Sequence, residues 1–218
     1  MTARLLLSVL LLAAAGCAEM RRPPPPPPPG DLLGSRPDAR VDPLRAGIEA
    51  TASAFADAGL SLAEKPALAA QAAAQLEYLA QNLPNSRNYA GISAPALRDL
   101  ALARDELREA LGINATAPAP QVMQALLDAA RALRAGQAEA AASALPPAWF
   151  RPGGTGSIRR FAEPGPLPQA ARASTALREE MLRLDANRLW LRGGQQDGIG
   201  METGTTGSGV MPGLGGGF

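Results

Sequence analysis

Between residues 42 and 192 the apolar side chains recur every three or four positions, which is the period of an amphipathic α-helix. No stretch keeps the alternation of apolar and polar residues that a half-buried strand requires. Capping residues, glycines and prolines divide this pattern into segments. The sequence therefore predicts an all-α bundle of about five amphipathic helices. These helices are expected at residues 43–58, 65–83, 93–111, 118–135 and 167–191, with a short helical turn at 137–145.

The spacing also predicts which side chains face the core. In the first helix Gly59 is expected to end the helix, after which Leu60 would cover Phe55. The second helix is expected to bury a stripe that includes Leu68. In the third helix the charged face is expected to form solvated ion pairs that contribute a few tenths of a kcal/mol each. The residues of this charged face are Arg98, Asp99, Asp105, Glu106, Arg108 and Glu109.

The segment 146–166 reads PPAWFRPGGTGSIRRFAEPGP and predicts an irregular loop, because it contains five prolines and four glycines. It also places aromatic side chains among arginines. One interpretation is a plug whose rings fold back over the bundle. The alternative is a groove that binds a small anionic or aromatic ligand. Its candidate binding residues would be Trp149, Arg151, Arg159, Arg160 and Phe161. The glycines lack the lysine and the spacing of a phosphate-binding loop.

At the N-terminus an apolar run from Leu5 to Ala15 follows Arg4. It is too short to cross a bilayer but matches the apolar region of a secretory signal peptide. It leads into Ala14-Ala15-Gly16-Cys17, which resembles the lipobox of bacterial lipoprotein precursors, with Ala14 where leucine is usual. The resemblance implies removal of residues 1–16 and attachment of lipid to Cys17. A plain secretory peptide is the main alternative, whereas the charges after Cys17 disfavour an uncleaved membrane helix.

The regions on either side of the helical pattern differ from it in composition. Residues 17–42 form a proline-rich linker in which Pro23–Pro29 predict a polyproline II rod of roughly 20 Å. This rod is interpreted as a spacer, or alternatively as a docking motif for an aromatic groove. Residues 193–218 are glycine-rich and predict a disordered tail. The predicted helical domain thus occupies residues 43–192.

The composition also limits the kinds of catalytic, metal-binding and nucleic-acid-binding site that the chain can form. The chain has no histidine and one cysteine, which excludes Ser-His-Asp and Cys-His catalysis and zinc sites built on nitrogen or sulfur. A formal net charge of +1 gives no basic surplus for nucleic acid. We therefore expect no metal, no cofactor and no catalysis, with a carboxylate-based hydrolase as the remaining enzymatic alternative.

These observations predict a lipid-anchored protein of the bacterial cell envelope. Its helical domain is expected to have a structural or protein-interaction role, with the ligand-binding module as the alternative. In enteric bacteria alanine after the lipid-bearing cysteine allows transfer to the outer membrane. By this resemblance Ala18 favours the outer membrane, with the domain in the periplasm. The expected partners are the membrane and an unidentified envelope protein.

Overall fold

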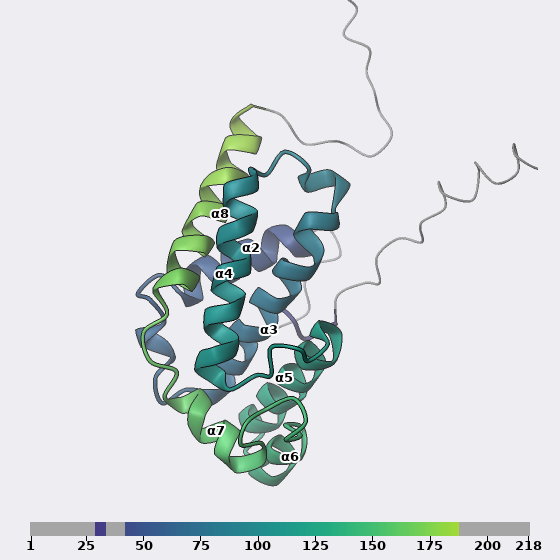
Figure 1. Ribbon diagram of the computed structural model, residues 1–218, viewed down its shortest axis with the longest axis vertical. Coiled ribbons are helices and arrows are strands. Elements are labelled where there is room, and N and C mark those ends of the chain that lie inside the picture. The colour runs from purple at the N-terminus through teal and green to yellow at the C-terminus, as the bar shows by residue number, and fades with distance from the viewer. Residues whose placement is uncertain (1–28, 34–41, 188–218) are drawn as a thin grey trace, which may run out of the picture.

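The computed structural model describes residues 29–33 and 42–187, and within these ranges it contains seven α-helices and no strand (Figure 1). The all-α prediction is confirmed. The helices are α2 (Pro43–Ala54), α3 (Pro66–Asn82), α4 (Ala94–Leu111), α5 (Ala119–Arg134), α6 (Ala138–Ser143), α7 (Gly154–Ala162) and α8 (Pro168–Ala186). The predictions for the signal peptide, Cys17, most of the linker, Leu191 and the tail at 193–218 lie outside the described residues.

The central element of the bundle is α3, which packs against α2, α4, α5 and α7. Every residue from Ala72 to Leu79 is buried, so this part of the helix has no exposed side. Its many alanines allow neighbouring helices to approach closely. The expected burial of Leu68 is wrong, because its side chain is 48% exposed. An alanine-rich helix has no single apolar stripe, and its spacing alone therefore could not orient it.

The connection after α2 also differs from the prediction. The helix ends at Ala54, earlier than expected, and Gly59 has the left-handed φ of 78° that was expected for a stop. Leu60 does not cover Phe55, because Leu60 is 63% exposed. The next apolar residue, Leu62, is buried instead, since the chain from Leu60 to Leu62 makes a turn of 3-10 helix. The backbone N–H of Leu167 donates to Ala58 O at 2.8 Å and fixes this turn.

A polar network closes the end of the bundle at which α8 finishes. Asp42 caps α2 by accepting a hydrogen bond from the Leu44 N–H at 2.8 Å. The Tyr89 hydroxyl is hydrogen-bonded to the same carboxylate. Arg45 donates through both terminal nitrogens to the two oxygens of Asp185, at 3.0 and 2.5 Å. These contacts join the start of α2 to the end of α8.

Both tyrosines of the chain, Tyr78 and Tyr89, are buried, and burial together with the Asp42 charge raises the pKa of each phenol above its usual value near 10. The folded protein therefore holds these protons more tightly than the unfolded chain does. The contribution of the two phenols to stability should be constant up to about pH 10 and should be lost as the pH rises further. A pH titration of tyrosinate absorbance and circular dichroism should show ionisation only with unfolding. A phenol that ionises near pH 10 in the folded protein would contradict this expectation.

Candidate functional site

The segment 146–166 is more regular than its composition suggests. Residues 154–162 form α7, so the prediction of an irregular loop is wrong for this part of the segment. The prolines lie before and after the helix and not within it. The backbone N–H of Gly153 donates to Ser157 Oγ at 3.0 Å across the first turn. The low helix propensity of the glycines is offset by burial of Phe161 on the inner face of the helix.

Two of the three aromatic rings in this segment are core residues. Phe150 and Phe161 are fully buried, and their rings meet edge to face with centroids 6.1 Å apart. Trp149 is partly exposed and packs against the core from outside. Its carbonyl accepts a hydrogen bond from the Asn114 N–H at 2.8 Å. The rings and backbone thus attach the segment to the end of α4.

This attachment requires a glycine at the end of α4. The Arg151 N–H donates to the Gly112 carbonyl at 2.7 Å. Gly112 has a left-handed φ of 70°, and a Cβ atom at this position would lie 2.3 Å from the Arg151 carbonyl oxygen. A larger residue would therefore push the two segments apart.

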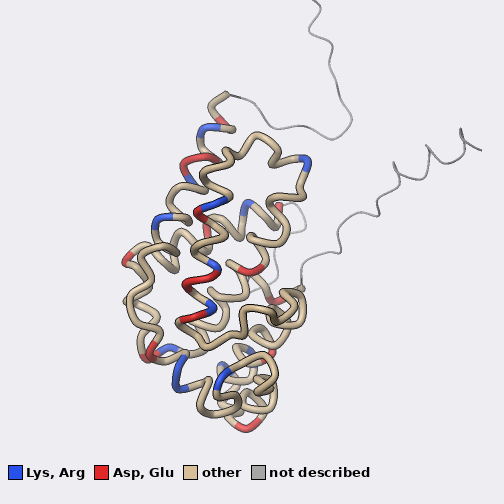
Figure 2. The backbone as a smooth tube through the Cα atoms, viewed as in Figure 1, with Lys and Arg blue, Asp and Glu red and all other residues tan. Residues whose placement is uncertain are grey.

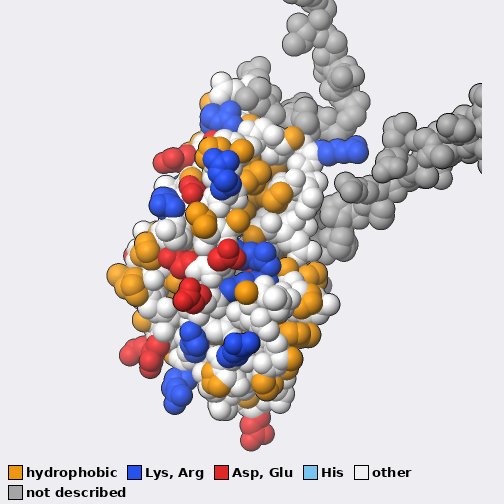
Figure 3. Space-filling view, in the orientation of Figure 1, with side chains coloured by type: hydrophobic (Ala, Val, Ile, Leu, Met, Phe, Trp, Pro, Cys, Tyr) orange, Lys and Arg blue, Asp and Glu red, His pale blue; other side chains and the backbone are white. Residues whose placement is uncertain are grey.

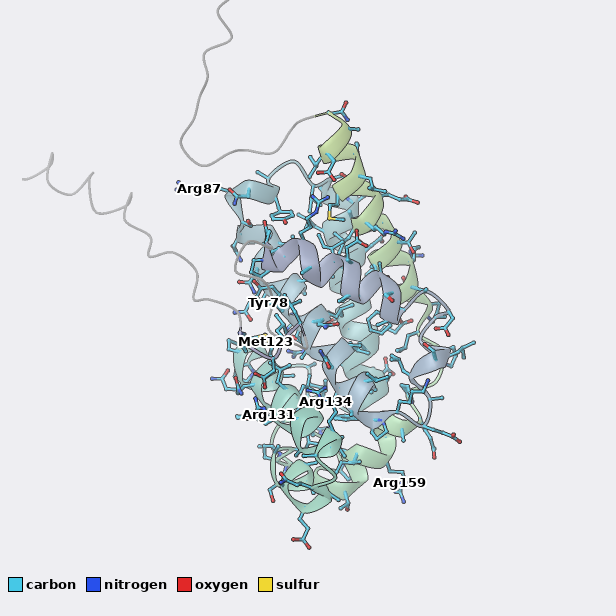
Figure 4. All side chains as sticks on the ribbon, turned by 180° about the vertical axis from the view of Figure 1, so that it is seen from behind. Tyr78, Arg87, Met123, Arg131, Arg134 and Arg159 are labelled. Atoms are coloured by element: carbon cyan, nitrogen blue, oxygen red, sulfur yellow. The ribbon has the colours of Figure 1, made fainter. Side chains whose placement is uncertain are left out.

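The three arginines of the segment have different surroundings. Arg160 donates from Nε to the Ala110 carbonyl at 2.7 Å and from Nη2 to the Glu109 carbonyl at 2.8 Å. It thereby caps the carboxyl end of α4, where a cation is favourable. Arg151 and Arg159 are exposed and form no ion pair with a described carboxylate. Figure 3 shows basic side chains over the lower end of the molecule, and in Figure 4 Arg159 points outward from α7.

The predicted binding residues face different ways, because Phe161 is buried whereas Arg151, Arg159 and Arg160 are exposed. A shallow cavity of about 320 Å³ borders Trp149, but no arginine lines it. Phe161 faces the core, on the inner side of the helix that carries Arg159. Ligand binding by this segment stays a prediction. The lipid attachment site, Cys17, lies outside the described residues.

A buried charge cluster between α3 and α4 is a feature that the sequence analysis missed. Glu77 and Arg108 are 2% and 3% exposed. One carboxylate oxygen of Glu77 accepts from Arg108 Nε, and the other accepts from Arg108 Nη2 and Arg104 Nε, both at 2.9 Å. The prediction that Arg108 belongs to a solvated face is therefore wrong. Figure 2 shows acidic and basic residues alternating along α4, a pattern that does not distinguish the inward arginine.

The same arginine also organises the loop between α4 and α5. Arg108 Nη1 donates to the carbonyls of Asn114, Ala115 and Ala117 at 3.0 to 3.2 Å. Every buried side-chain nitrogen and oxygen of the described residues has a hydrogen-bond partner. A satisfied cluster of this kind supports a structural role. One feature of the sequence does point to this charge cluster: Glu77 is the only charged residue of α3.

A groove beside the central helix lies between α2 and α3. It has a volume of about 390 Å³, and its lining includes the exposed Leu68 and the buried Leu62. Lys65, the only lysine of the chain, lies at its edge and donates from Nζ to the Ser61 carbonyl at 3.0 Å. Its ammonium group is therefore engaged locally and does not point to a catalytic amine.

Comparison with known proteins gives no relative: no family model, no curated protein and no solved structure matches the chain. None of the helices in residues 42–187 is long and apolar enough to cross a membrane. In the part of the chain that the structure describes, no group of three or more acidic, histidine or cysteine residues could hold a metal ion.

Proposed function

We propose that this chain is a lipid-anchored protein of the bacterial envelope whose helical domain binds another envelope protein. The observation that carries the proposal is the Ala14-Ala15-Gly16-Cys17 motif at the end of the apolar run that begins at Leu5. A diacylglyceryl group on Cys17 would carry two acyl chains, and acylation of its new amino group would add a third. Since each buried methylene contributes about 0.8 kcal/mol, such an anchor is stable.

Two features of the domain support protein binding over catalysis. The buried charges of Glu77 and Arg108 form an ion pair with each other, and every buried side-chain nitrogen and oxygen of the described residues has a hydrogen-bond partner. The outer surface carries large apolar side chains that a partner could cover, such as Leu102 of α4 and Leu182 of α8, which are 51% and 54% exposed. The alternative of a small-ligand module is weaker, because the cavity beside Trp149 contains no arginine.

The lipid anchor is tested by replacing Cys17 with alanine in the full precursor. We expect loss of lipid labelling, accumulation of the uncut chain and no mature form in the membrane fraction, because the acylated thiol is missing. The matched control is Ser8→Ala, which changes the same apolar run and leaves the cysteine intact. Normal processing and membrane attachment of the Cys17→Ala chain would refute the proposal.

The partner is sought in a separate experiment, by affinity purification of the detergent-solubilised, lipidated protein.

A further inference from the structure

Residues 29–33, here called the strap, begin at the last proline of the proline run and are packed onto the domain. The Leu32 side chain is fully buried in the hydrophobic core, and Leu33 packs against that core. The Leu32 carbonyl accepts a hydrogen bond from Gln75 Nε2 of α3 at 2.9 Å. Asp31 forms an ion pair with Arg131 of α5, with Arg131 Nε 2.6 Å from Asp31 Oδ2. The strap therefore bridges two helices.

The interaction with Gln75 indicates that the strap belongs to the folded domain. Gln75 is 6% exposed, and its amide donates to the strap across 43 residues of sequence. Without the strap this donor would lose its protein partner, which costs free energy when the group stays buried. The strap thus combines apolar burial, a buried hydrogen bond and an ion pair within one short segment.

We propose that the strap fixes the point from which the membrane arm leaves the domain. The effect of the strap on the orientation of the domain rests on the proposed lipid anchor at Cys17. With the strap docked, the chain between the proposed anchor and the nearest residue fixed on the domain runs from Cys17 to Pro29, instead of from Cys17 to Asp42. At about 3.1 Å per residue for a polyproline II chain, its reach falls from roughly 78 Å to roughly 37 Å. The docked strap therefore roughly halves the distance by which the domain can move away from the proposed anchor.

The position of the strap also determines which side of the bundle faces the membrane. Arg131 and Asp128, which are joined by an ion pair, place the strap contact on the outer face of α5. In contrast, α8 packs on α4 and α2. Figure 1 shows α8 along one edge of the bundle, and in Figure 4 the labelled α5 residues Met123 and Arg131 lie toward the edge opposite α8. A short arm that leaves beside α5 holds α5 toward the membrane and α8 away from it.

Docking of the strap is tested by thiol reactivity in the mature chain with Cys17→Ser, which removes the native thiol. A cysteine at position 32 should react at least about tenfold more slowly than one at position 30, because Leu32 is buried and Gly30 is exposed. Gly30 is a suitable control, since an added Cβ meets nothing within 4 Å. Adding Gln75→Ala should accelerate only the reaction at position 32. Equal rates at the two positions in chains with native circular dichroism would overturn the proposal.

The orientation is tested with the lipidated protein in vesicles that carry quenchers in the lipid headgroups. Fluorophores are attached to single introduced cysteines, Gln124→Cys on α5 or Thr175→Cys on α8, both exposed positions. We expect at least about twofold stronger quenching at position 124, and loss of this difference when Leu32→Ser releases the strap. Equal quenching in the parent protein would refute the orientation. Failure of the protein to float with the vesicles would instead refute the lipid anchor, and the thiol rates would still decide whether the strap docks.

Discussion

Replacement of Glu77 by alanine is expected to lower the free energy of unfolding by about 3 to 5 kcal/mol. The substitution removes the acceptor of both Arg108 and Arg104 and leaves the Arg108 guanidinium buried without a counter-charge. The three loop carbonyls bound by Arg108 Nη1 cannot replace it, since they provide no negative charge. Urea denaturation followed by circular dichroism measures the change.

The matched control is Glu49→Ala, which removes an ion pair with Arg178 on the surface, where the two side chains are 48% and 57% exposed. This substitution should change the free energy of unfolding by no more than about 1 kcal/mol. A double variant, Glu77→Leu with Arg108→Leu, should lose less stability than Glu77→Ala, because no buried charge remains. If Glu77→Ala shifted the unfolding midpoint no more than Glu49→Ala, the cluster would have no special structural role.

Replacement of Phe161 by alanine is expected to lower the free energy of unfolding by about 3 to 5 kcal/mol, because apolar burial is lost and a cavity is left behind. The ring is fully buried and also forms the edge-to-face contact with Phe150. Phe161→Leu keeps most of the volume and should cost less. Arg159→Ala on the exposed side of α7 is the control and should change stability by no more than about 0.5 kcal/mol. Similar urea midpoints for Phe161→Ala and Arg159→Ala would show that α7 is not anchored by its aromatic ring.

The sequence allowed the fold class and the main helices to be predicted because capping residues and prolines divide the apolar pattern clearly. Ser93 and Asp42 cap α4 and α2, and Gly112 ends α4 in the left-handed conformation. The orientation of α3 could not be predicted, because alanine packs on any face of a helix. The helix at 154–162 is hidden for a different reason: the segment 146–166 as a whole is rich in proline and glycine, although its prolines lie outside the helical part.

The candidate site was less predictable than the fold. Nothing local in the sequence separates Arg160, which caps a helix 50 residues away, from the exposed Arg159 beside it. Likewise, Arg108 is one of several charges on α4, and only the position of Glu77 on another helix draws it inward. Leu32 lies in the predicted linker, and its carbonyl is bound by Gln75 of α3, which is 43 residues away. In each case the partner is distant in sequence, so periodicity within one segment could not reveal it.

The enclosure of α3 has a consequence for how this protein can diverge. Since the residues from Ala72 to Leu79 are all buried, this part of α3 offers no surface to a partner. The proposed binding of a partner would use side chains of the surrounding helices and loops, such as the exposed Leu102 and Leu182. The positions that maintain the fold and those that select a partner are then largely separate sets. Substitutions in the outer layer could change binding specificity while the central helix, with its single buried acid, preserves the fold.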